Sequence, residues 1–242
     1  MHWSAPADNG SQSHYSRAVG VVGAHRVGTL RSVAVLSREE FDAIEFDAAF
    51  SGEHRSAAQR MTTLARTGTQ TEAMPRAEAF LRAGEQWLLA DDPAAAASRF
   101  RMAMADGGSA SVDPRVPLAR ALFQLGEADE ARALIATLKG EGRTDPRACD
   151  LVAELLVEYS DPQGALEWAT AGVELCLRYA EREGAPAPGR EPSPDRRLAS
   201  VPAHRQRSDD ETELRLLLSL RYRIRNDLGL PEDSYDEMLD ET

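Results

Sequence analysis

The dipeptide Asp-Pro occurs four times in the middle of the chain, each time directly before a run of residues with helical spacing. The four copies are Asp92-Pro93, Asp113-Pro114, Asp145-Pro146 and Asp161-Pro162. An Asp side chain caps the free amide groups at a helix start, and Pro suits the first helical position because its missing N–H would be unbonded there. Four such starts between residues 92 and 162 predict short helices in series, as in a helical repeat.

The composition limits the classes of partner and the cellular setting. The chain has 242 residues, which allows one or two domains, and a net charge of −12. This acidic balance argues against nucleic acid or an anionic membrane as a general target. Two cysteines, Cys149 and Cys176, do not make a disulfide framework and indicate a reducing setting. They are expected to be small buried side chains, with a redox pair as the alternative. The strong preference for Arg over Lys is typical of a GC-rich bacterial genome.

Neither the start of the chain nor its most apolar early stretch predicts contact with a membrane. The first residues lack the basic start and apolar run of a secretory signal. Residues 19–36 are interrupted by His25, Arg26 and Arg31, whereas a membrane span needs about 20 consecutive apolar residues. We therefore expect a cytoplasmic protein.

The pattern along the chain predicts four regions. Residues 1–70 are weakly patterned and are expected to be weakly structured or disordered, with patchy alternation near residues 21–35 and one modest helix after a capping box at Ser37 and Glu40. Part of this region can also lie upstream of the natural start. Residues 72–181 form the repeat domain, and residues 182–210 a Pro-rich linker. Residues 211–239 form a C-terminal helical segment, with a stop signal at Gly229 and Pro231.

A regularity of 34 or 35 residues runs through the second region. Three helical runs begin at Ala96, Ala131 and Ala165, which are 131 − 96 = 35 and 165 − 131 = 34 residues apart. Each alanine follows a small residue by twelve positions and a large apolar residue by nine. The small residues are Gly84, Ala119 and Ala153, and the large ones are Trp87, Leu122 and Leu156. Two short antiparallel helices cannot bury their apolar faces alone, so stacked neighbours must complete the core.

This period and pattern resemble the tetratricopeptide repeat (TPR) family. The first copy fits best, with Gly84, Trp87, Ala96, Phe100 and Ala103. In the third copy Ala169 replaces the bulky residue and Gly172 the final alanine, and the family's closing proline is displaced in all three copies. The resemblance implies an all-α helical-repeat solenoid of about three helix hairpins. We expect it to carry a C-terminal capping helix and a poorly ordered N-terminal region.

The resemblance also implies a binding site, because the family binds peptides on the concave face formed by the first helix of each hairpin. The matching candidate partner-binding residues are Leu81, Glu85, Leu88, Arg120, Phe123, Gln124, Arg147, Glu154 and Glu158. Their mixture of apolar and acidic groups suits a ligand with an apolar anchor and basic residues. Two alternatives are ordinary solvated helix faces and a groove filled by the protein's own C-terminal helix.

One well-known use of such a groove, the capture of acidic chaperone tails through Lys and Asn residues, is not favoured. The matching positions are Leu81, Glu85, Pro117, Arg147 and Leu151. Only Arg147 is basic, and Glu85 would repel a carboxylate. The partner is therefore expected to be a different protein or peptide.

Two other functions compete with partner capture. Self-association through the stack or the final helix would make the chain a homo-oligomer. Nucleic acid could also contact Arg221, Arg223 and Arg225 beside Tyr222. However, the acidic residues that follow favour a solvated helix face, so nucleic acid is the weaker alternative. The same stretch resembles the tail of some actinobacterial TPR-bearing proteins, without the Cys-rich metal motif that some of them carry.

No residue set in the sequence predicts catalysis, a metal or a cofactor. The five histidines are scattered and lack metal-ligand spacing, and there is no Cys-x-x-Cys pair. Neither a phosphate-binding glycine loop nor a Gly-x-Ser-x-Gly elbow is present. The sequence therefore predicts a non-catalytic protein-interaction module.

Overall fold

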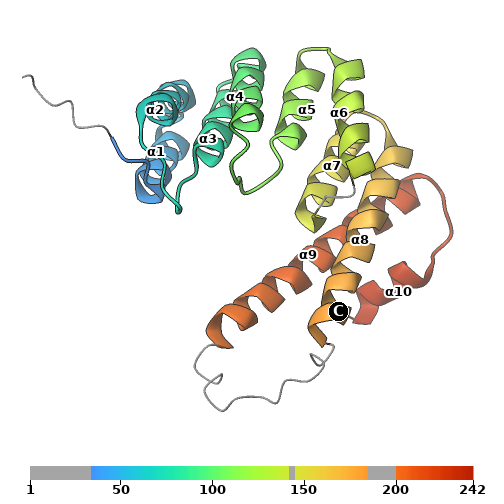
Figure 1. The fold of residues 1–242 in the computed structure, drawn as a ribbon. Helices are drawn as coiled ribbons and strands as arrows, with labels where there is room; N and C mark the ends of the chain where they lie inside the picture. Colours follow the sequence, from blue (N-terminus) through green and yellow to red (C-terminus); the bar gives the residue numbers. More distant parts are fainter. Residues whose placement is uncertain (1–33, 142–144, 185–199, 242) are drawn as a thin grey trace, which may run out of the picture. The chain divides into compact units, whose positions relative to one another are not determined.

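The computed structural model describes residues 34–141, 145–184 and 200–241, and this part of the chain is all-α (Figure 1). Apart from an isolated bridge between Val35 and Thr69, it contains helices only. The helices are α1 (Arg38–Ser51), α2 (His54–Thr67), α3 (Arg76–Leu89), α4 (Pro93–Asp106), α5 (Arg115–Gln124), α6 (Ala128–Glu141), α7 (Pro146–Glu158), α8 (Pro162–Gly184), α9 (Ser200–Asp227) and α10 (Ser234–Glu241). The all-α repeat class predicted from the sequence is confirmed.

The Asp-Pro dipeptides start helices as predicted. Helices α4, α7 and α8 begin at the proline, and the preceding aspartate accepts a hydrogen bond from a backbone amide of the first turn. At α5 the start is shifted by one residue, because Pro114 takes the cap position and the Asp113 carboxylate accepts from the amide of Arg115. Each aspartate thereby satisfies one of the amides that a helix start leaves without a partner.

The residues of the repeat pattern form the core between paired helices. Three hairpins, α3–α4, α5–α6 and α7–α8, pack one after another, and every small and large residue of the pattern is buried. The residues from Trp87 to Ile224 that fill these contacts belong to one hydrophobic cluster. Stacking of neighbouring hairpins therefore closes the core, as a repeat architecture requires.

The first hairpin of the repeat depends on a glycine. A Cβ atom added at Gly84 would lie 2.4 Å from the Phe100 ring. Because Gly84 has no side chain, the fully buried ring of Phe100 on α4 can lie directly against the backbone of α3. The small residue Gly84 and the bulky residue Phe100 of the family pattern therefore contact each other directly.

Residues 38–67 differ from the expectation of a weakly structured region, because they form a further hairpin, α1–α2, that packs on α3. The capping box begins α1 as expected, with the Ser37 hydroxyl accepting from the Glu40 amide. The hairpin was missed because Ala57, which corresponds to Ala96, lies 96 − 57 = 39 residues before it and thus outside the period. Much of its core is alanine, which gives a weak apolar pattern.

Part of the sequence prediction falls outside the described residues. The disordered segment expected at residues 1–20, and all but the end of the alternating stretch at 21–35, belong to residues 1–33. Within the described part, the Ala34 carbonyl accepts a hydrogen bond from the Thr69 amide, and the Leu36 amide donates to Thr69. This short pairing joins the start of the described chain to the end of α2.

The C-terminal helix α9 caps the third hairpin. It packs against α8 and α7 and buries Leu217, Leu218 and Ile224 in the main cluster. A Cβ atom at Gly172 would lie 2.7 Å from Leu217, so the glycine that departs from the repeat pattern makes room for the cap. Helix α9 starts at Ser200, earlier than the expected linker end, while residues 185–199 lie outside the described part.

We predict that Gly84→Ala destabilises the protein by about 1–3 kcal/mol, because the new methyl group must displace the Phe100 ring in a packed core. The free energy of unfolding in urea measures the effect. Gly140→Ala is the matched control, because a Cβ atom at Gly140 meets nothing within 4 Å. That control should be neutral or stabilising by up to about 1 kcal/mol, as expected for alanine in a helix. Equal stability of both variants would contradict the packing argument.

We predict that Leu217→Ala lowers the free energy of unfolding by about 2–5 kcal/mol, because it leaves a cavity where α9 caps the stack. The adjacent Leu216 is 53% exposed, so Leu216→Ala should change stability by no more than about 0.5 kcal/mol. Thermal and urea unfolding compare the two. A mild effect at both positions would mean that α9 does not cap the stack in solution.

Candidate functional site

The first helices of the three hairpins enclose a hollow of about 220 Å³. Helix α3 contributes Glu85 and Leu88, α5 contributes two apolar residues and Arg120, and α7 contributes two leucines. The lining residues are Glu85, Leu88, Val112, Val116, Pro117, Arg120, Leu151 and Leu155. Three of the predicted partner-binding residues, Glu85, Leu88 and Arg120, are therefore brought together by the fold.

Helical spacing explains why these residues meet. Side chains three or four positions apart lie on the same face of a helix. Glu85 and Leu88 on α3, Val116 and Arg120 on α5, and Leu151 and Leu155 on α7 are such pairs. Each pair places apolar atoms in the hollow, and two pairs add a charged group. The result is an apolar hollow bordered by one acidic and one basic side chain.

The basic group of this site is held in place by an acid from the neighbouring hairpin. The Arg120 guanidinium lies 3.0 Å from the Glu158 carboxylate of α7. Both side chains are partly exposed, so the pair orients the two groups more than it stabilises the fold. Glu158, a predicted site residue, therefore contacts the site through Arg120.

Two predicted residues belong to the core and not to the exposed wall. Leu81 is fully buried. Phe123 is 6% exposed and stacks on Tyr159, with ring centroids 4.4 Å apart. The Arg132 guanidinium covers the Phe123 ring. Neither side chain is accessible to a partner in this structure, because Leu81 of α3 is packed in the main cluster and Phe123 is covered by Tyr159 and Arg132.

The remaining predicted residues are exposed but do not line the hollow. Gln124, Arg147 and Glu154 are exposed at the surfaces of α5 and α7. Arg147 is close enough to lower the pKa of Glu85 through its charge. Conversely, Val112 and Leu155 line the hollow and were missed. Leu155 lies one turn after Leu151 on α7, so helical spacing carried a usable signal for it, whereas Val112 lies in the loop before α5.

Glu85 has unusual electrostatic surroundings. Its side chain reaches solvent, yet the walls of the hollow replace much of the surrounding water. This partial dehydration, together with the negative charges of Glu45 and Glu78, raises the pKa of Glu85 to about 7. The charges of Arg82 and Arg147 oppose this shift without cancelling it.

A second acid with a raised pKa lies on α7. Burial and the charges of Glu154 and Glu213 raise the pKa of Asp150 to about 6, against the opposing charge of Arg223. Glu213 and Arg223 come from α9, so this acid faces the cap as well as its own helix. Acidic side chains of α7 and α9 therefore lie close together at Asp150.

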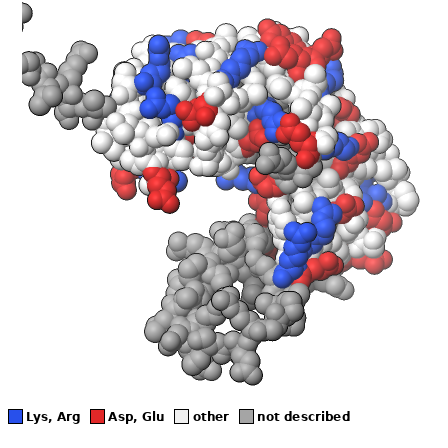
Figure 2. Space-filling view, in the orientation of Figure 1, with Lys and Arg blue, Asp and Glu red and all other residues white. Residues whose placement is uncertain are grey.

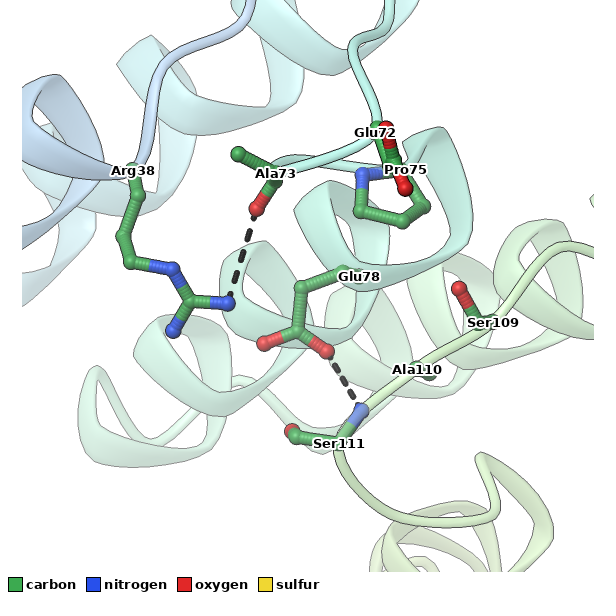
Figure 3. Close-up of a pocket in the computed structure, with 8 residues that line it drawn as sticks. All are labelled: Arg38, Glu72, Ala73, Pro75, Glu78, Ser109, Ala110 and Ser111. Atoms are coloured by element: carbon green, nitrogen blue, oxygen red, sulfur yellow. Dashed lines mark hydrogen bonds between the residues drawn. The ribbon is translucent and has the colours of Figure 1, made fainter. Parts of the chain in front are cut away.

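Figure 3 shows another cavity, of about 330 Å³, between the start of α1, the α2–α3 loop, α3 and the α4–α5 loop. Its lining residues are Arg38, Glu72, Ala73, Pro75, Glu78, Ser109, Ala110 and Ser111. The buried Glu78 carboxylate accepts a hydrogen bond of 2.7 Å from the Ser111 amide, and Arg38 donates to the Ala73 carbonyl. The Glu78 bond fastens the α4–α5 loop to α3, so this carboxylate is already engaged within the protein.

The C-terminal arginines are engaged inside the protein. Arg221 is 4% exposed, donates to Thr170 of α8 and forms ion pairs with Asp233 and Asp236. Arg225 pairs with the same two acids. Of the three arginines considered for nucleic acid, only Arg223 is exposed. The expectation of a solvated helix face is therefore corrected, because Arg221 fastens α10 to α8 and α9.

The surface charge does not favour nucleic acid either. On the face shown in Figure 2, basic side chains are interspersed with acidic ones and do not form one continuous basic surface. Several arginines of the described part are paired with acids, as Arg55 is with Asp92 and Arg101 with Glu130. Phosphate binding needs several unpaired cations close together.

Within residues 34–141, 145–184 and 200–241, no three His, Cys, Asp or Glu side chains are grouped so that they could hold a metal ion. No helix in the described part of the chain combines the length and the apolar character needed to cross a bilayer. Cys149 and Cys176 are buried thiols in the main cluster.

Comparison with known families finds a match in the middle of the chain. The family model of the tetratricopeptide repeat matches residues 88–155, which run from the end of α3 into α7. The matched stretch contains two of the three alanines that define the period, Ala96 and Ala131. Neither a search of curated proteins nor a search of solved structures gives a match.

We predict that the ion pairs of Arg221 make the C-terminal end sensitive to acid. Hydrogen bonds from Arg221 lower the pKa of Asp233 to about 2. A depressed pKa in the folded state stabilises the fold fully above the unfolded value of about 3.9, and this contribution is lost as pH falls toward 2. Asp233→Asn should therefore lower the melting temperature at pH 7, and its difference from wild type should shrink between pH 4 and pH 2.

Circular dichroism melts across this pH range measure the difference. Glu232→Gln is the control, because it removes a charge from an exposed neighbouring residue. A difference between Asp233→Asn and wild type that stays constant down to pH 2 would contradict the proposed role of the ion pair.

Proposed function

We propose that this chain, a TPR-like protein, is a protein-interaction module that captures a segment of a partner protein in the hollow between α3, α5 and α7. The observation that supports this proposal is the hollow itself, which has apolar walls and a charged border on the inner helices of the repeat. Repeats of this kind generally mediate protein–protein interaction. Candidate contact residues are Glu85, Leu88, Arg120, Gln124, Arg147, Glu154 and Glu158.

The position of α9 favours an accessible hollow. Helix α9 packs on α7 and α8, and the hollow is lined by residues 85–88, 112–120 and 151–155. Of the two roles considered for the C-terminal helix, capping the stack and filling the groove, its contacts support capping. A partner can then reach the hollow without displacing part of the described chain.

The proposal includes a non-catalytic role in the cytoplasm. The hollow holds one carboxylate and one guanidinium, and the latter is already paired with Glu158. Such a set can bind and orient a ligand, but it offers no nucleophile with an adjacent base. The fold is also one that typically serves binding.

Self-association is a second candidate function that one observation favours. Phe46 and Phe50 on α1 are 73% and 90% exposed, and they lie on the same face of the helix because they are four residues apart. These two neighbouring exposed rings on the α1–α2 hairpin form an apolar surface that a second copy of the chain could cover. Light scattering of wild type and of Phe46→Ser plus Phe50→Ser separates this function from partner capture.

We predict that Leu88→Gln plus Arg120→Glu abolishes capture of the partner from the native lysate. The double variant places an amide in the apolar hollow and reverses the charge on its border, which should lower affinity by at least about tenfold. The measurement is a pull-down analysed by quantitative mass spectrometry, with circular dichroism to check folding.

Leu89→Gln plus Arg101→Glu is the matched control. Leu89 is the exposed neighbour of Leu88, and Arg101 on α4 is paired with a glutamate, as Arg120 is. A partner retained by the wild type and the control but lost by the first variant supports the hollow as the site. Equal recovery by all three proteins would reject it and direct attention to self-association.

A further inference from the structure

Glu85 is the acid at this hollow that has no ion pair or side-chain hydrogen bond within the described part of the chain. Its neighbours are engaged: Glu45 pairs with Arg82, Glu78 accepts from the Ser111 amide, and Glu158 pairs with Arg120. Among the ion pairs and side-chain hydrogen bonds of the described residues, none involves Glu85. A carboxylate on the border of an apolar hollow is thus left for a ligand.

The surrounding charges determine which ligand Glu85 prefers. The charged groups that face it are Glu45 from α1, Glu78 and Arg82 from α3, and Arg147 from α7, while Arg120 from α5 shares the hollow. Arg82 is neutralised by Asp42 and Glu45, and Arg120 by Glu158. Of these cations, only the exposed Arg147 has no ion pair among the described residues. The field at Glu85 therefore favours a positively charged group.

The apolar part of the hollow determines the rest of the ligand. The half-buried Leu88 and Leu151 present aliphatic surface, and the buried Val116 and Leu155 complete the lining. A volume of about 220 Å³ accommodates one aliphatic side chain of medium size. An acidic ligand would be repelled by Glu85. A purely apolar ligand would cover this carboxylate without giving it a partner, which is unfavourable.

We propose that the hollow binds a peptide segment in which an aliphatic side chain enters the apolar part and a neighbouring Lys or Arg pairs with Glu85. This inference rests on the proposed function, because it names the partner chemistry of the same site. The paired cation replaces the water that the walls of the hollow exclude from the carboxylate, and a charge-assisted hydrogen bond is among the stronger polar contacts. The aliphatic group provides affinity, and Glu85 provides selection.

Binding of this kind depends on pH, and the sign follows from the raised pKa of Glu85. In the free protein this carboxyl titrates near pH 7, and only its ionised form pairs with a cation. Affinity should therefore be full near pH 8 and fall by up to about tenfold per pH unit below pH 7. Asp150, whose pKa is raised to about 6 and which faces Glu154, Glu213 and Arg223, titrates at lower pH.

The test uses the full chain and a phage-displayed library of random peptides selected at pH 8. An enriched peptide is synthesised in two forms, one with its Lys or Arg and one with Gln in that place. Calorimetry at pH 8, 7 and 6.5 measures both forms against wild type, Glu85→Gln and Leu88→Gln. Glu181→Gln is the charge control, because it removes an exposed acid from α8.

The expected result is enrichment of an aliphatic residue next to Lys or Arg. Glu85→Gln should weaken the cationic peptide by about tenfold at pH 8 and flatten its pH dependence between pH 8 and 6.5, whereas Glu181→Gln should do neither. The Gln form of the peptide should bind wild type and Glu85→Gln equally.

Two results would overturn the inference, and they separate it from the proposed function. Enriched peptides that lose affinity with Leu88→Gln but bind Glu85→Gln as tightly as wild type would reject the cationic partner and leave the hollow as a binding site. No enrichment, or peptides that are insensitive to both substitutions, would reject both the partner chemistry and the site.

Discussion

The close contact between the two helices of each hairpin determines the rest of the structure. At Gly84 the backbone of α3 lies directly against the Phe100 ring, and Ala119 and Ala153 occupy the equivalent position in the next two hairpins. Larger side chains there would push the helices apart. Because α3, α5 and α7 are each fixed against their own partner helix, their free faces lie side by side and enclose the hollow.

Arginine ion pairs fasten both ends of this stack. At the N-terminal end of the stack, Arg82 of α3 donates hydrogen bonds to Glu45 and Asp42 of α1. At the other end Arg221 joins α8, α9 and the residues that begin α10. End hairpins have a neighbour on one side only, so directional polar contacts supplement a smaller apolar interface there. Arginine suits this role because its planar group binds two acids at once.

Features that recur from one repeat to the next could be predicted from the sequence. Features that depend on a changed spacing or on contacts between separate helices could not. The helix starts at Asp-Pro and the buried alanines follow from local rules, and the helix that forms the α9 cap follows from its own apolar face. The α1–α2 hairpin was missed because Ala57 lies 39 residues before Ala96, a longer spacing that arises because α3 has 14 residues whereas α5 has 10. At the candidate site, the family resemblance put Glu85, Leu88 and Arg120 on one face, and the fold brings all three to the same hollow. It could not show that Tyr159 covers Phe123 or that two acids hold Arg221, because those contacts join separate helices.

The difference between Glu85 and Glu158 shows why position matters more than residue type at this site. Both are glutamates on first helices of hairpins, and the sequence gives no reason to separate them. Glu158 faces Arg120 and is neutralised, so a ligand that approaches it must compete with an existing ion pair. Glu85 faces two acids and aliphatic walls, and its ionised form is destabilised until a cation arrives. The net charge of −12 attracts basic segments in general. The ionised Glu85 carboxylate is stabilised when a cationic ligand binds. This makes binding selective, because a ligand with Lys or Arg is favoured over a neutral ligand.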